Sequence, residues 1–321
     1  MLHARSIFVF LAAFHSLAVS GSWIPRDLKV ALGEIDSGSI HRIRLRTFDE
    51  ASGNRWMLVL DPENLETSVR LEEGWTVHDT LGADSTAWGK LRRSEMDFGW
   101  KNSGLSHVLA KESGIVLSVD LCPSHHPLDR RLIVRILDAF RRDGKPVPVS
   151  FALSGDWIRC HGNDLAWLVA LVDSAKIDPT WINHTDHHYY RKGLAENLNF
   201  LFLPGTNVTR EILGAESEML RHGVVPSVFF RFPGLVDNES IFAEVLETGL
   251  LPVGADAWLA KNQKPGAGSI VLVHGNGNEP VGVDDFLHLL DKHRSDIQKG
   301  VWHLEDLSGE LEEETESVKT P

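Results

Sequence analysis

The order of apolar and polar positions changes near residue 113. In the preceding segment HRIRLRTF the two kinds of side chain alternate, with Ile43 and Leu45 opposite Arg42, Arg44 and Arg46. A second run, RWMLVLDP, follows after an SGN turn, which is typical of a hairpin. We therefore predict a small antiparallel β module over residues 23–112. Its arginine side is expected to face solvent, with contact to an anionic glycan as the alternative.

From residue 113 onward, short apolar runs alternate with helical patterns. GIVLSVD, VPVSFAL, SVFFRF and SIVLVH have the continuous apolar character of buried strands. LDRRLIVRILDAFRRDG and VDDFLHLLDKHR instead place apolar residues at helical spacing. This alternation predicts an α/β domain with a parallel sheet over residues 113–307. About seven strands, the last in GVWHLE (300–305), favour a barrel or distorted barrel.

The ends of the chain differ from its body. Residues 1–22 combine Arg5, the apolar run IFVFLAAFHSLAV and small residues before Gly21, which predicts a signal peptide. We expect an exported protein, periplasmic or extracellular, with no stable membrane insertion after cleavage, since no later run is long and apolar enough to span a membrane.

Charge narrows the possible partners. The 321 residues carry a net charge of −13, and seven acids between residues 305 and 316 account for about half of it. We expect residues 308–321 to form an acidic, disordered tail. The absence of a basic stretch excludes a nucleic-acid partner of the usual kind.

Polar residues stand where five predicted strands end: Asp120, His184, Arg231, Asp256 and His274. In a β/α barrel the carboxyl ends of the strands meet on one face, where the chemistry occurs. These five residues are therefore expected to converge.

Each of these residues suggests a role. His184 and His188 are four apart, so a helical turn after the strand would let both rings share a metal ion, zinc first, with cobalt or nickel as alternatives. Asp120 is a candidate general base, or the ion-pair partner of Arg231. His274 is a candidate general acid, or a core histidine.

Further candidates are less tightly defined. Asp256 could orient His274, and Trp258 could line an apolar pocket beside it. Trp157 and Trp181 flank the predicted site and could stack on sugar rings, with core packing as the alternative.

Five short motifs occur in the order known from one enzyme family: SVDLCP (118–123), NHTDHH (183–188), RFPG (231–234), DAW (256–258) and IVLVH (270–274). Together they make the chain from Gly114 to Glu305 resemble a polysaccharide deacetylase domain of the NodB-homology type, carbohydrate esterase family 4. The resemblance implies a distorted (β/α)7 barrel that removes acetyl groups, usually N-linked, from a glycan with a divalent metal ion.

The resemblance also implies roles by position. Asp120 would be the base and His274 the acid, while His184 and His188 would bind the metal. Arg231 would orient Asp120. In the same way Asp256 would tune His274, and Trp258 with Pro233 would contact the acetylated glycan.

The first motif departs from the family at Leu121, where a carboxylate normally provides the third metal ligand. The sequence leaves its replacement open among Cys122, Asp120, His125 or His126, and water. A disulfide between Cys122 and Cys160 is equally open. Two other functions stay possible: a non-catalytic glycan-binding protein without a metal, and a deacylase of a small N-acyl or O-acetyl compound.

Overall fold

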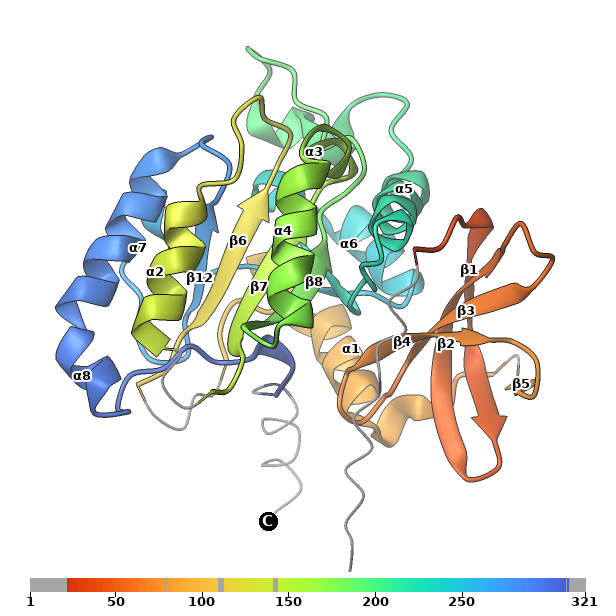
Figure 1. Ribbon diagram of the computed structural model, residues 1–321. Coiled ribbons are helices and arrows are strands. Elements are labelled where there is room, and N and C mark those ends of the chain that lie inside the picture. Colours follow the sequence, from red (N-terminus) through yellow and green to blue (C-terminus); the bar gives the residue numbers. More distant parts are fainter. Residues whose placement is uncertain (1–21, 79, 109–112, 141–143, 310, 312–321) are drawn as a thin grey trace, which may run out of the picture.

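The computed structural model describes residues 22–309 and 311, except for 79, 109–112 and 141–143. It contains two sheets, a five-stranded one from the N-terminal part and a seven-stranded one from the rest (Figure 1). The predicted signal peptide lies outside the described residues, apart from residue 22. Within the described part, no helix has both the length and the apolar character to cross a membrane.

The first sheet is antiparallel and confirms the predicted hairpins. Its strands are β1 (Arg26–Ser37), β2 (Ile40–Asp49), β3 (Arg55–Leu60), β4 (Thr67–Leu71) and β5 (Thr76–His78). They pair in the order β4-β3-β2-β1-β5. The alternating pattern of residues 41–48 accordingly forms the centre of a sheet and not an edge.

The prediction that the arginine side of this strand faces solvent is wrong for Arg46. Arg46 is fully buried, and its guanidinium forms two hydrogen bonds, of 2.7 and 2.8 Å, with the carboxylate of Glu216. Arg42 and Arg44 are partly buried and pair with Asp61 and Glu72. The second sheet and its helices cover this end of strand β2, which alternation alone cannot reveal.

The second sheet has seven strands, all parallel, and curls into a half-barrel (Figure 1). In spatial order they are β10 (Leu251–Pro252), β9 (Phe229–Phe230), β8 (Ile177–Asn183), β7 (Val147–Leu153), β6 (Val116–Leu121), β12 (Ile270–His274) and β11 (Ala257–Trp258). This is the distorted (β/α)7 arrangement predicted from the sequence.

Helices connect and cover these strands. They are α1 (Ala87–Phe98), α2 (Arg130–Phe140), α3 (Gly155–Cys160), α4 (Gly162–Asp173), α5 (Val208–Arg221), α6 (Glu239–Glu247), α7 (Pro280–Lys292) and α8 (Arg294–Gln298). Residues 117, 119 and 121 of β6 pack in the cluster that contains helices α2, α4 and α7. Alternate residues of the strand therefore face the opposite side, toward the barrel interior.

Two details of the barrel differ from the prediction. The segment 300–305 forms only a single bridge, between Leu304 and Ile115, and β11 is the seventh strand instead. The stretch 105–108 runs from the edge strand β10 to the start of β12: Leu105 bonds to Pro252 of β10, and Val108 bonds to Gly268, just before β12. A segment that precedes the barrel in sequence thus helps to close it.

The two sheets share a hydrophobic core. Ile43, Leu45 and Leu58 of the first sheet lie in one buried cluster with Val116 and Phe229 of the second. Leu307 and Leu311 belong to the same cluster, so the chain packs against the core beyond residue 307, where the acidic tail was expected to begin. Residue 310 and residues 312–321 of that tail lie outside the described residues.

Candidate functional site

The site is built on the C-terminal ends of β6, β8 and β12. Asp120 and His274 are register partners in the adjacent strands β6 and β12. His184 follows β8 directly, and Arg231 follows β9. The structure therefore brings four of the five strand-end residues together, as the barrel prediction required.

Asp120 is buried and held by Arg231. Its Oδ1 lies 3.3 Å from Arg231 Nη1, and its side chain is 4% exposed. Arg231 is fully buried and also donates to the carbonyls of Val253 and Gly254 and to Ser118 Oγ. Burial lowers the pKa of Arg231, and the charge of Asp120 opposes this shift. An arginine fixed by so many bonds is a rigid counter-charge for the carboxylate.

His184 presents its Nε2 to the site. Its Nδ1 lies 2.8 Å from the carbonyl oxygen of Arg231, an acceptor that requires the proton to be on Nδ1. The Nε2 lone pair then points toward Asp120 Oδ2 at 3.8 Å and Cys122 Sγ at 3.5 Å. Burial lowers the pKa of His184 to about 4, so the ring is neutral. A neutral imidazole fixed by a backbone carbonyl is the usual form of a metal-binding histidine.

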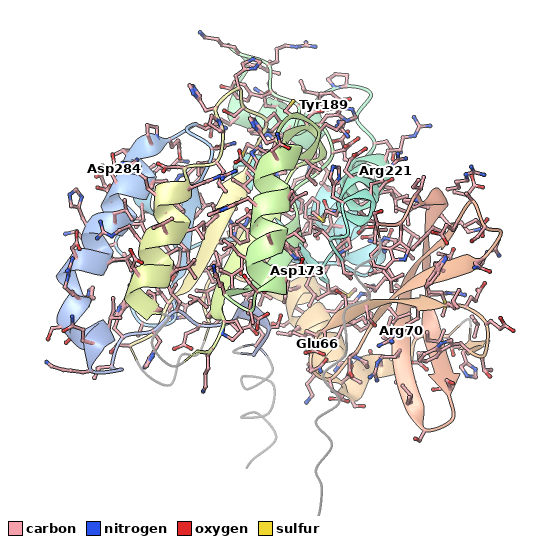
Figure 2. All side chains as sticks on the ribbon, viewed as in Figure 1. Glu66, Arg70, Asp173, Tyr189, Arg221 and Asp284 are labelled. Carbon is pink, nitrogen blue, oxygen red and sulfur yellow. The ribbon has the colours of Figure 1, made fainter. Side chains whose placement is uncertain are left out.

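His188 reaches the site without the helical turn predicted after the strand. Residues 184–190 are not helical, and Thr185 and His188 adopt positive φ angles of 67° and 50°. The loop nevertheless places the rings of His184 and His188 with centroids 4.7 Å apart. Phe200 packs edge-on against His188 at 5.2 Å. Figure 2 shows Tyr189 near the top of the molecule, on this same loop.

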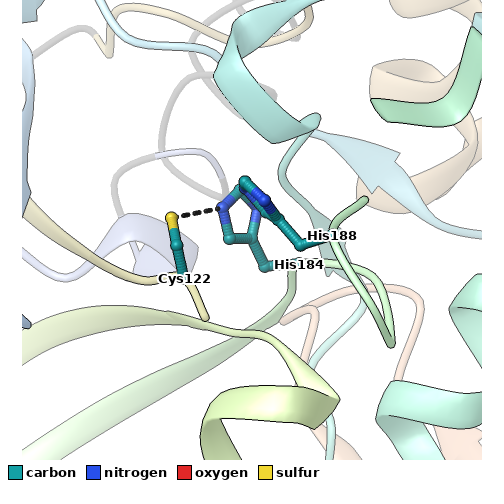
Figure 3. Close-up of side chains that lie close together, drawn as sticks. All are labelled: Cys122, His184 and His188. Atoms are coloured by element: carbon teal, nitrogen blue, oxygen red, sulfur yellow. Dashed lines mark hydrogen bonds between the residues drawn. The ribbon is translucent and has the colours of Figure 1, made fainter. Parts of the chain in front are cut away.

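Cys122 completes a group of three possible metal ligands. One ligand atom each from Cys122, His184 and His188 lies within 4.8 Å of the other two (Figure 3). His188 Nε2 is buried and has no hydrogen-bond partner among the described residues, so a bound metal ion would satisfy it. Burial raises the pKa of the Cys122 thiol, but the charges of His188 and His274 outweigh this effect and lower it from 9.0 to about 7.

These donors fit a divalent metal. Zinc is bound by thiolate at about 2.3 Å and by imidazole at about 2.0–2.1 Å, so a tetrahedral angle separates the two donors by about 3.6 Å. The distance from Cys122 Sγ to His184 Nε2 is 3.5 Å. Cys122 and Cys160 are both free, which rules out the disulfide that the sequence left open.

Glu279 is a site residue that the sequence analysis missed. Its Oε2 lies 2.9 Å from Nδ1 of His274, an ion-pair contact at an angle outside the hydrogen-bond range. It also accepts a hydrogen bond of 2.7 Å from Trp258 Nε1. Burial opposes protonation of His274, but the nearby charges of Cys122, Glu279 and Asp120 outweigh it and raise its pKa well above the usual value. The sequence signal was an acid placed directly before Pro280, at the start of α7.

Asp256 lies apart from His274. Its carboxylate is 2.7 Å from Nδ1 of His107, within the segment 105–108, and 3.3 Å from Oγ of Ser269, which pairs with His107. Glu279 occupies the place beside His274 that the sequence analysis expected for Asp256. The difference arises because the segment 105–108 inserts next to β12 and brings its own partner for the aspartate.

The predicted substrate-binding residues fall into two groups. Trp258 is 8% exposed, and its ring centroid lies 5.7 Å from that of His274, while Pro233 is buried at the start of the turn after Arg231. Trp157 is fully buried and Trp181 stacks on Phe151, both within the main hydrophobic cluster. The structure thus gives Trp157 and Trp181 the core-packing role that was their alternative.

Comparison with solved structures finds similarity to carbohydrate esterases of family 4. No family model matches the chain. A family 4 carbohydrate esterase from Bacillus anthracis is 20% identical over 68% of this chain and 91% of its own, with a TM-score of 0.46. Bacillus subtilis PdaA, of the same family, is 16% identical over 69% and 89%, with a TM-score of 0.46. A family 4 pseudoenzyme from Bacillus anthracis is 14% identical over 63% and 66%, with a TM-score of 0.43.

Proposed function

We propose that the protein is a metal-dependent hydrolase that removes acetyl groups, chiefly N-acetyl, from a carbohydrate. The observation that carries this proposal is the buried contact of Asp120 with Arg231 and with the lone-pair side of His184. A carboxylate beside a cation and next to neutral metal ligands can accept a proton from water. The motif resemblance adds the substrate class, an acetylated glycan.

Each side chain of the site has a separate role in this reaction. His184 and His188 would hold the divalent metal, zinc first, which supplies polarisation of the acetyl carbonyl and acidification of water when bound. Asp120 takes the proton of the attacking water, and Arg231 holds this carboxylate in place. His274, on the neighbouring strand, donates a proton to the leaving nitrogen. Trp258 and Pro233 form the wall beside the acetyl group.

The test is acetate release by the zinc-loaded protein from N-acetylglucosamine oligomers, a small N-acyl amine and an O-acetyl ester. Asp120→Asn and His274→Ala are each expected to lower kcat by at least about a hundredfold, as is usual when a general base or acid is removed. Asp173→Asn and His222→Ala, at exposed positions away from the site, are the matched controls. Circular dichroism of each variant checks that the fold is retained.

The outcomes separate this function from its rivals. Acetate release only from the ester or the small amine would replace the glycan by a small acylated compound. Glycan binding with no acetate from any substrate, under any divalent metal, would refute hydrolysis and leave a binding protein. Full activity in Asp120→Asn or His274→Ala would refute the role assigned to that residue.

A further inference from the structure

The position at which the first motif departs from the family, Leu121, faces away from the site. Leu121 is fully buried in the cluster with Leu128 and Leu132, on the helix side of β6. Successive side chains of a strand point to opposite faces, so Asp120 faces the interior. Cys122, the first residue after β6, points to the same side, because its Sγ lies 3.5 Å from His184 Nε2. Ser118 on that face contacts Arg231, in agreement with the alternation. A metal ligand at position 122 therefore faces the site, whereas one at position 121 would face the core.

Cys122 occupies that position and has the contacts of a ligand. It is 4% exposed, and its Sγ lies 3.5 Å from the Nε2 lone pair of His184. The other ligand candidates from the same loop, His125 and His126, are exposed. Asp120 is held by Arg231 instead. A buried thiol without a disulfide partner, beside two imidazoles, is a donor set of two nitrogens and one sulfur.

We propose that Cys122 is the third protein ligand of a two-histidine, one-cysteine metal site, and that its thiolate makes the site select thiophilic ions over hard ones. The proposal rests on the metal dependence of the proposed function. Thiolate ligands favour zinc, cobalt and cadmium, whereas carboxylate ligands suit magnesium and manganese. The fourth position is left for water or substrate, as in catalytic zinc sites.

Cobalt substitution tests the ligand set independently of activity. A thiolate bound to Co²⁺ gives a sulfur-to-cobalt charge-transfer band in the near ultraviolet, which nitrogen and oxygen ligands do not give. The wild-type protein and Cys160→Ser are expected to show this band, Cys160 being the exposed cysteine and the matched control. Cys122→Ser is expected to lose it while still binding Co²⁺ more weakly. His184→Ala/His188→Ala should bind none.

Metal preference is the second measurement. Competition between Zn²⁺ and Mn²⁺ is measured for the wild type and for Cys122→Asp, which keeps an anionic donor but exchanges sulfur for oxygen. We expect the zinc-to-manganese affinity ratio to fall at least tenfold in the variant. Thermal unfolding of both apoproteins shows whether the exchange has harmed the fold, and Cys122→Ser is used in its place if it has.

Several results would overturn the inference: histidine-dependent Co²⁺ binding without the band, a band that survives in Cys122→Ser, or no metal binding at all. Its failure is distinct from that of the proposed function. Acetate release by a metal-loaded protein that lacks the band would leave hydrolysis standing without the thiolate. A band without acetate release would leave the thiolate site standing without hydrolysis.

Discussion

Removal of Arg46 alone from its buried ion pair with Glu216 is expected to destabilise the whole protein. Arg46 lies on strand β2 of the first sheet and Glu216 on helix α5 beside the second, and both side chains are fully buried. The pair is bidentate, at 2.7 and 2.8 Å, and Arg46 Nη1 also donates to the carbonyl of Thr248 at 2.6 Å. It therefore links the first sheet to two parts of the barrel.

The magnitude follows from what the substitution leaves behind. Arg46→Met keeps most of the apolar stem and removes the guanidinium, so the Glu216 carboxylate stays buried without its partner. Loss of one member of such a pair costs about 3–5 kcal/mol of the free energy of unfolding. Replacing both members by apolar residues of similar size is often close to neutral. We therefore expect Arg46→Met/Glu216→Leu to recover most of the loss, short of about 1 kcal/mol for the unpaired carbonyl.

Urea unfolding followed by circular dichroism measures these changes. Arg42→Met is the matched control, because Arg42 lies on the same strand and pairs with Asp61 at 2.8 Å but is 32% exposed. A partly solvated pair of this kind contributes far less than a buried one, on the order of 1 kcal/mol. Equal losses for Arg42→Met and Arg46→Met, or a double variant as unstable as the single one, would contradict the reasoning.

Three further predictions concern single side chains. Burial raises the pKa of Glu95 from 4.5 to about 8, so the folded state holds a proton that the unfolded state releases. The free energy of unfolding should therefore fall as pH rises from about 4.5 to 8, by at most about 4 kcal/mol. Glu95→Gln should remove this pH dependence in urea titrations. Glu279→Gln should lower kcat about tenfold with little change in KM for an acetylated glycan, because it deprives His274 of its counter-charge; an unchanged kcat would leave Glu279 no positioning role. Tyr190, 61% exposed beside Phe200, offers a face for a sugar ring, so Tyr190→Ala should raise KM for oligomers about two- to tenfold while Tyr190→Phe does not.

The long strands of the barrel could be predicted because a strand that is buried on both faces has a mainly apolar sequence. β6, β7 and β12 are mainly apolar runs of five to seven residues; β7 and β12 lie within the predicted segments, and β6 ends one residue beyond its own. The strands β9, β10 and β11 have two residues each, which is too short for a periodic pattern. The segment 300–305 shows the opposite case, since it has a strand-like pattern but pairs at Leu304 alone.

The sequence predicts which residues form the site better than it predicts how they are arranged. Position at the end of a strand was enough to group Asp120, His184, Arg231 and His274, since parallel strands end together. The route of the chain after β8 was not predictable, because two residues that are neither glycine nor asparagine, Thr185 and His188, take left-handed conformations there. The partner of His274 depends on how α7 starts, which its sequence marks only by an acid before a proline.

The first motif illustrates why a missing ligand does not imply a missing site. The sequence alone leaves the third metal ligand open, because a motif is compared position by position and does not show which way each side chain points. Leu121, the last residue of β6, contributes to the core, while Cys122, the first residue after it, points to His184. The absence of a carboxylate at position 121 therefore does not leave the two histidines without a third donor. If the cobalt spectrum shows thiolate coordination, the site holds its metal ion with a soft donor, and zinc should be preferred to manganese.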